Sequence, residues 1–158
     1  MKCKTIQNLT ILILTIVTTI CTIFVTCVVY DEFYTGVDIS GTWLMYDTVK
    51  KSANQQWVDS NLNLTFQVNF IQNAFNISGS GDKRKENDSI AKYHSILTID
   101  GNIRGKNIRA KFVEEGDSGR ISTGFFLWEV ISKDTLLGTF NSTARESSGS
   151  SKLVRKPK

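Results

Sequence analysis

The chain has 158 residues and a formal net charge of +4, and 41% of its residues are hydrophobic. Apart from one apolar N-terminal stretch, this length provides one domain of ordinary size with a real core rather than two. The charge is too modest to indicate binding to a DNA or RNA polymer, and the basic segment 152–158 either solubilises the C-terminus or contacts anionic lipid or phosphate.

All three cysteines, Cys3, Cys21 and Cys27, lie in or before the apolar stretch. The remaining domain therefore contains no disulfide and must be stable through packing alone. This is ordinary for a bacterial domain and unusual for a small eukaryotic secreted one.

Residues 9–30, LTILILTIVTTICTIFVTCVVY, contain no charged side chain. Their length matches a helix of roughly 20 residues crossing about 30 Å of hydrocarbon. The β-branched residues would weaken a helix in water, but lipid forces the backbone amides to bond within the segment. The sequence therefore predicts a single transmembrane helix at 9–30, preceded by an N-terminal flank at 1–8.

A cleaved signal peptide is the alternative, because Lys2 and Lys4 precede the apolar run. The run is longer than the usual apolar region of a signal peptide, and no Ala-x-Ala site follows it, so we expect the helix to be retained. The positive-inside rule, applied to the same two lysines, favours a cytoplasmic N-terminus and an external domain. Two lysines do not fix the side on which the domain lies.

A short acidic linker at 31–38 follows, and the first strand is expected at Ile39–Tyr46. Between 47 and 60 the periodicity fades, which indicates a loop or a short helix. Strict period-two alternation returns over Leu62–Phe70, where apolar and polar residues point to opposite sides. This pattern indicates one buried face and one face in water.

The remaining strands follow at short intervals. We expect them at 74–78, 93–99, around 103 and 108–112, 121–132, 135–144 and 152–155. We expect turns or polar loops at 79–88, 100–101, 104–107, 115–119, 133–134 and 147–151.

About eight strands without a helical pattern between them exclude βαβ units. The predicted fold is all-β, a small eight-stranded antiparallel up-and-down barrel at 39–156 with a tail at 157–158. A closed barrel leaves no exposed sheet edge.

Catalytic signals are absent from the sequence. The single histidine, His94, is expected on a wet face, and no Gly-x-Ser-x-Gly motif supports a serine nucleophile. Neither glycine pair, at 79 and 81 or at 101 and 105, precedes a helix, as a phosphate-binding loop requires. Glu114 and Glu115 are adjacent and point to opposite faces of a strand. We therefore expect no enzymatic activity, no bound metal and no cofactor.

Binding is the expected activity. Among the aromatic residues, most belong to a core, and one or two, Trp128 among them, line a ligand site. Arginine suits bidentate contact with phosphate, although a solvated surface is the alternative for each of Arg104, Arg109, Arg120 and Arg145. On the strand at 135–145, polar groups share one face and end in a cation. The candidate ligand-binding residues are Arg109, Trp128, Thr139, Asn141, Thr143 and Arg145.

Gly41-Thr-Trp43 at the first strand and Arg155 on the last resemble the Gly-x-Trp motif and the closing arginine of lipocalin- and avidin-like barrels. The resemblance implies that Gly41, Trp43 and Arg155 pack together and close one end of the barrel.

The complete plan, a membrane anchor followed by Ile39-Ser-Gly-Thr-Trp43 and a compact barrel, resembles the CD-NTase-associated β-barrel effector of bacterial CBASS antiphage systems. The resemblance implies a barrel that binds a cyclic di- or oligonucleotide in the cytoplasm, forms a homo-oligomer and disrupts the bacterial inner membrane, killing the infected cell. That family has two membrane helices, whereas this sequence predicts one. The second hypothesis is a membrane-tethered, lipocalin-like module that binds a small molecule or a protein outside the cytoplasm.

Overall fold

The computed structural model describes residues 2–33, 36–117 and 119–157. The chain divides into two compact units, residues 1–34 and residues 35–158. The first is helix α1 (Lys2–Phe33), which contains the predicted helix at 9–30 and extends beyond it into the predicted flank and linker. Within the described part of the chain, no helix combines the length and the apolar character that crossing a membrane requires. Residues 1, 34–35, 118 and 158 of the predicted flank, linker, turn and tail lie outside the described residues.

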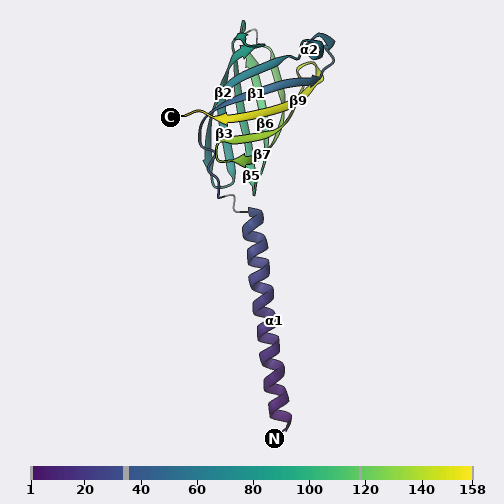
Figure 1. Ribbon diagram of the computed structural model, residues 1–158, viewed down its shortest axis with the longest axis vertical. Helices are drawn as coiled ribbons and strands as arrows, with labels where there is room; N and C mark the ends of the chain where they lie inside the picture. Colours follow the sequence, from purple (N-terminus) through teal and green to yellow (C-terminus); the bar gives the residue numbers. More distant parts are fainter. Residues whose placement is uncertain (1, 34–35, 118, 158) are drawn as a thin grey trace. The chain divides into compact units, whose positions relative to one another are not determined.

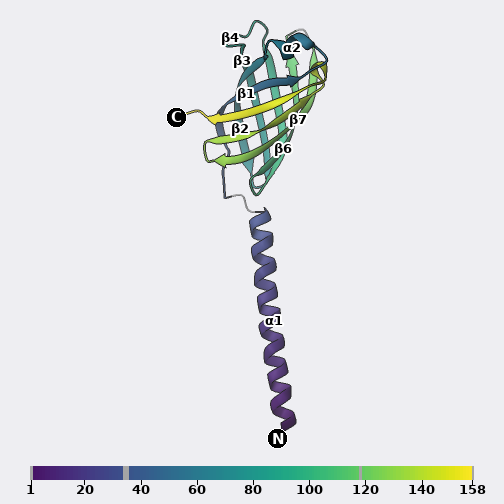
Figure 2. The same ribbon diagram turned by 45° about the vertical axis from the view of Figure 1, so that its right-hand side comes forward.

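The second unit contains the strands and two short helices. In chain order these are β1 (Gly41–Lys51), α2 (Gln55–Asp59), β2 (Asn63–Asn73), β3 (Asn76–Glu86), β4 (Ser89–Ile90), β5 (Ser95–Arg104), β6 (Asn107–Gly116), β7 (Ile121–Ser132), β8 (Thr135–Ser142), the 3₁₀ helix η1 (Ala144–Glu146) and β9 (Ser147–Arg155). Helix α2 falls in the segment where the sequence predicts a loop or a short helix, and it lies at one end of the strands (Figures 1 and 2).

Eight of these strands form a closed antiparallel barrel. The order is β2-β1-β9-β8-β7-β6-β5-β3, and β2 also pairs with β3, so the sheet returns on itself (Figure 1). Each strand therefore pairs with its neighbours in the chain, apart from the closing pair β1 and β9. The two-residue β4 only extends the pairing of β3. The predicted eight-stranded antiparallel barrel is confirmed.

Aromatic side chains fill much of the interior. The Phe126 ring stacks on Trp128 with centroids 4.4 Å apart, and the centroid of the Phe112 ring lies 4.6 Å from that of Phe126. Phe70 contacts Trp128 edge-on at 6.0 Å. Full burial of one such side chain contributes about 1.5–3 kcal/mol. The hydrophobic core is therefore inside the barrel, where side chains from opposite strands meet.

Three predicted turns are wrong. The supposed polar loop at 79–88 belongs largely to β3, the supposed hairpin at Asp100-Gly101 is inside β5, and the supposed turn at 147–151 is the first half of β9. The turn between β5 and β6 lies at Gly105-Lys106, within the segment 104–107 where a turn or polar loop is expected. Each misassigned segment is polar because one face of its strand is in water.

Close packing explains the glycines that suggested those turns. A Cβ atom at Gly79 would lie 2.7 Å from Cδ1 of Phe70, and one at Gly101 would lie 2.6 Å from the Cα of Ala110. These glycines occupy positions where a ring or a neighbouring strand leaves no room for a side chain. In a tightly curved barrel, glycine within a strand marks close approach and not chain reversal.

The three residues suggested as a closing group lie together. The guanidinium carbon of Arg155 lies 4.4 Å from the Trp43 ring centroid. Arg155 donates from its two terminal nitrogens to the carbonyl oxygens of Ser40 at 2.6 Å and Asp38 at 2.7 Å. Its Nε donates to the Lys133 carbonyl at 3.0 Å. Gly41 has a φ of +118°, and a Cβ there would be 3.3 Å from Nη1 of Arg155.

Arg155→Ala should lower the free energy of unfolding by about 2–4 kcal/mol. It removes the hydrogen bonds of a charged donor to three carbonyl groups, and such bonds contribute about 1.5–3 kcal/mol each before relaxation. Urea denaturation of the full chain measures the effect. Lys152→Ala, an exposed change on the same strand, is the control. Equal stability of the two variants would contradict this account of closure.

Candidate functional site

The six predicted ligand-binding residues do not form one cluster. Trp128 is buried inside the barrel, where its Nε1 donates to Oγ of Ser151 at 2.9 Å. Arg109, Thr139 and Asn141 are exposed on the outer face. Trp128 is therefore a core residue that cannot share a site with the outward-facing ones.

Thr143 and Arg145 lie beyond the end of β8. Oγ1 of Thr143 accepts a hydrogen bond from the Thr123 amide at 2.9 Å. Arg145 is in η1 with a φ of 52°, and its carbonyl oxygen accepts from Ser52 and Ala53. Both residues form hydrogen bonds that fix the connection between β8 and β9, and neither lines the groove described next.

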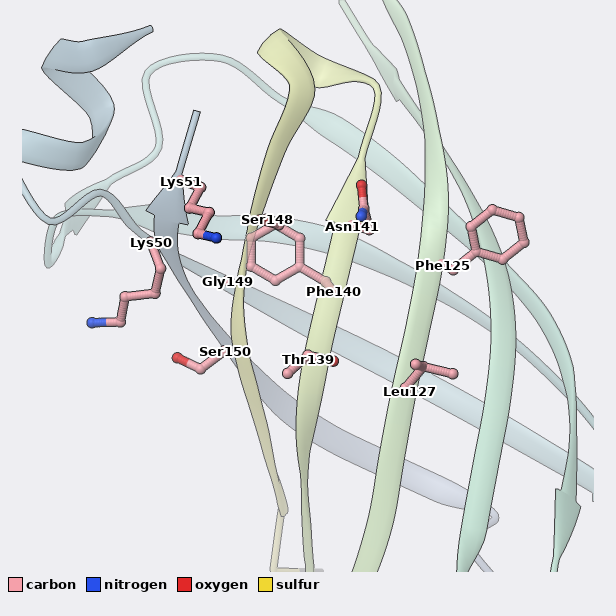
Figure 3. A pocket seen from close by; sticks show the side chains of 10 residues that line it. All are labelled: Lys50, Lys51, Phe125, Leu127, Thr139, Phe140, Asn141, Ser148, Gly149 and Ser150. Atoms are coloured by element: carbon pink, nitrogen blue, oxygen red, sulfur yellow. The ribbon is translucent and has the colours of Figure 1, made fainter. Parts of the chain in front are cut away.

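An open groove of about 480 Å³ crosses the outer face of β7, β8, β9 and the end of β1 (Figure 3). Its lining residues are Lys50, Lys51, Phe125, Leu127, Thr139, Phe140, Asn141, Ser148, Gly149 and Ser150. Two predicted residues, Thr139 and Asn141, lie in it. Lys50, Lys51 and Leu127 are not among the predicted ligand-binding residues, and Phe125 belongs to the aromatic residues of which most are expected in a core.

Strand register sets the order of groups across this groove. Asn141 pairs with Phe125 on β7 and with Ser148 on β9. One step along the strands, Thr139 pairs with Leu127 and with Ser150. Hydroxyl and amide groups in the middle of the groove are thus bordered by apolar side chains on one side.

A β-bulge places the two lysines at the other side. The register between β1 and β9 shifts between Val49 and Lys51, so β1 carries an extra residue opposite Ser148 and Gly149. A bulge puts consecutive residues in positions that regular alternation would send to opposite faces. Lys50 and Lys51 are both exposed, and none of the residues that line the groove is acidic. From β1 to β7 the groove is lined by lysines, then by hydrogen-bonding groups, then by the Phe125 ring; in Figure 3 the Lys51 side chain extends toward β9 and the Lys50 side chain extends away from it.

The carboxyl group of Asp47 is buried inside the barrel. The pKa of this carboxyl is raised to about 7, mainly by burial and to a smaller extent by the charge of Glu114, whereas a hydrogen bond with Ser151 opposes the rise. Among the described residues, Oδ1 of Asp47 has no hydrogen-bond partner. Glu114 accepts hydrogen bonds from Oγ of Ser95 at 2.7 Å and pairs with Lys83 at 3.3 Å. Lys83 therefore forms its ion pair with Glu114 and not with Asp47, which is stable as a neutral acid.

In the part of the chain that the structure describes, no three His, Cys, Asp or Glu side chains lie close enough together to bind a metal ion. His94 is exposed, with Nε2 3.7 Å from Asp82 and Nδ1 3.7 Å from Asp117. This places it in water, as the alternation of residues 92–99 predicts.

The stability of the barrel should fall as pH rises between about 4 and 7. Asp47 is ionised above its ordinary pKa of 3.8 in the unfolded chain but only above about 7 in the folded one, so folding takes up a proton in this range. Asp47→Asn should remove most of this pH dependence and raise stability at about pH 8 by up to roughly 4 kcal/mol, since one pKa unit corresponds to about 1.4 kcal/mol. Urea denaturation at about pH 5 and about pH 8 measures it. The exposed Asp100→Asn is the control, and an unchanged pH dependence in Asp47→Asn would refute the assignment.

Comparison with known proteins adds evidence on the fold. No protein-family model matches the chain, and no curated protein matches it either. A solved de novo designed fluorescence-activating β-barrel is similar, with a TM-score of 0.51 and 14% identity over 75% of this chain and 94% of the designed one. At this identity the similarity shows the fold alone, a small antiparallel β-barrel.

Proposed function

We propose that the protein is a membrane-anchored β-barrel effector of bacterial antiphage defence, and that its outer groove binds a cyclic di- or oligonucleotide. The observation that carries this proposal is the pair Lys50 and Lys51 on one side of a groove whose other side holds the exposed ring of Phe125. Nucleotides combine the same two chemistries, a phosphate and a flat aromatic base.

The groove offers one group for each part of such a ligand. Lysine ammonium groups attract phosphate oxygens as point charges. Stacking of a base on an aromatic ring contributes about 1–3 kcal/mol. The amide of Asn141, next to Phe125, carries both a donor and an acceptor for the edge of a base.

The anchor rests on the charge-free sequence at 9–30 and on the way α1 satisfies its polar groups. Thr19, Thr22 and Thr26 each donate their hydroxyl to the carbonyl oxygen four residues earlier, at 2.6–2.8 Å. Such bonds hide the hydroxyls from the surroundings, as hydrocarbon requires. Large apolar side chains such as Leu14, Ile20 and Phe24 are more than half exposed in the isolated chain, which suits a helix surrounded by lipid.

The effector step is clustering of the anchors. Ligand binding gathers barrels into a homo-oligomer, and this brings the Thr- and Ile-rich helices together in the bacterial inner membrane. There, threonine hydroxyls released from their own carbonyls bond across helices, and the packed helices disturb the bilayer. This mechanism requires the barrel to lie on the cytoplasmic side, where the nucleotide is made.

Titration of the full chain in detergent with cyclic dinucleotides tests the ligand. The double variant Lys50→Glu, Lys51→Glu should weaken binding at least tenfold, or about 1.4 kcal/mol, because it reverses the charge beside the phosphate. Phe125→Ala should cost about 1–3 kcal/mol through lost stacking. Lys106→Glu, an exposed lysine at the β5–β6 turn, controls for net charge. Equal weakening by Lys106→Glu would leave the groove without a role.

Protease treatment tests the side of the membrane. In intact spheroplasts the barrel should resist digestion, and it should be digested once the membranes are lysed. Digestion in intact spheroplasts would place the barrel outside the cytoplasm. That result would refute nucleotide sensing and favour an external binding module.

A further inference from the structure

The outer face of β7 is largely apolar, although Thr123 and Glu129 also lie on it. Ile121, Phe125, Leu127 and Ile131 point outward with exposed fractions of 65%, 56%, 53% and 54%. They alternate with buried residues, among them Phe126 and Trp128. An antiparallel strand with one face in water is ordinarily polar on that face. We refer to Ile121, Phe125, Leu127 and Ile131 as the β7 stripe.

Cations border the centre of the β7 stripe. Arg109 pairs with Leu127, and Lys111 pairs with Phe125, both from β6. Lys50 and Lys51 lie across the groove that begins at the same two apolar residues. Two acids flank the stripe: Glu129 lies on β7 between Leu127 and Ile131, opposite Asn107, and Glu115 lies opposite Ile121. The centre of this face is therefore apolar with a positive border.

An anionic bilayer surface matches this arrangement. Aromatic and aliphatic side chains enter the boundary between headgroups and acyl chains, and the long stems of Lys and Arg carry their charges to the phosphates. Each basic residue near such a surface contributes about 1 kcal/mol. A second copy of the chain would present the same positive border, so charge favours lipid over self-association.

The short linker between α1 and the barrel keeps the barrel near the bilayer if α1 is the membrane anchor. The inference of membrane docking therefore rests on the proposed function. Five residues, 34–38, separate the end of α1 at Phe33 from Ile39, which is buried in the barrel core. Fully extended, five residues span at most about 18 Å. The barrel is thus confined to the layer of water next to the headgroups.

We infer that the β7 stripe, with Arg109 and Lys111, docks on anionic lipid headgroups of the membrane that holds the anchor. Phe125 and Leu127 also line the proposed ligand groove. A bound ligand and the bilayer therefore exclude each other at these two residues, and ligand binding releases the barrel from the membrane surface.

A fluorescent label on the outer face of β7 tests the docking. Thr123→Cys places a thiol between Ile121 and Phe125 without removing an apolar residue, in a full-length background with Cys3→Ala, Cys21→Ala and Cys27→Ala. Ser80→Cys, exposed on β3, is the matched control position. Each protein carries an environment-sensitive NBD label and is reconstituted into vesicles of phosphatidylcholine, alone or with an equal amount of phosphatidylglycerol.

The label at 123 should shift to the blue and brighten only when phosphatidylglycerol is present, and the label at 80 should not change. Arg109→Glu with Lys111→Glu should abolish the shift while leaving the urea midpoint unchanged, because both side chains are exposed. Identical emission at 123 in the two kinds of vesicle would overturn the inference. A shift that follows protein density and not lipid charge would also overturn it, in favour of a second copy.

Retention of the protein after a carbonate wash reports on the anchor separately. A retained protein without a lipid-dependent shift refutes docking and leaves the proposed function intact. An extracted protein refutes the anchor, and the label then still reports whether the free chain binds anionic vesicles.

Discussion

Closure of the sheet by β1 and β9 is the constraint on which the rest of this structure depends. The pairing Trp43 with Arg155 ends that seam, and the Arg155 side chain fastens the chain before β1 and the turn before β8 to the same point. Once the sheet is closed, inward side chains have only each other to pack against. Phe70, Phe112, Phe126 and Trp128 occupy this space, and the groove of about 480 Å³ lies on the outside.

The sequence predicts the parts of the fold that follow from local pattern. Residues 9–30 predict their helix because no charge interrupts them, and 62–70 predict a strand because apolar and polar residues alternate. Gly79, Gly101 and Gly149 wrongly predict turns. Each is a glycine because another strand or an aromatic ring lies too close for a side chain, and only the closed barrel creates this contact. Local sequence contains no information about that contact.

The site was harder to predict than the fold for the same reason. In Phe125-Phe126-Leu127-Trp128 every residue is apolar, so alternation cannot tell which pair points outward, and Trp128 was assigned to the ligand instead of the core. Lys50 and Lys51 reach one groove only through a bulge whose position depends on β9. The outward direction of Thr139 and Asn141 follows from the sequence because their strand does alternate. The burial of Asp47, a charged residue type within a strand, had no signal in the sequence.

Strand pairing across the seam also sets an order of events during synthesis. Residues 41–51 can pair with β2 as soon as the first hairpin leaves the ribosome, but their other partner is β9, roughly a hundred residues later in the chain. Long-range pairing of this kind folds slowly, because loop closure must precede the contacts that reward it. The nascent barrel remains an open sheet with two free edges until residue 155 has emerged. By then the N-terminal helix has long left the ribosome, so the helix can form well before the domain that follows it is closed.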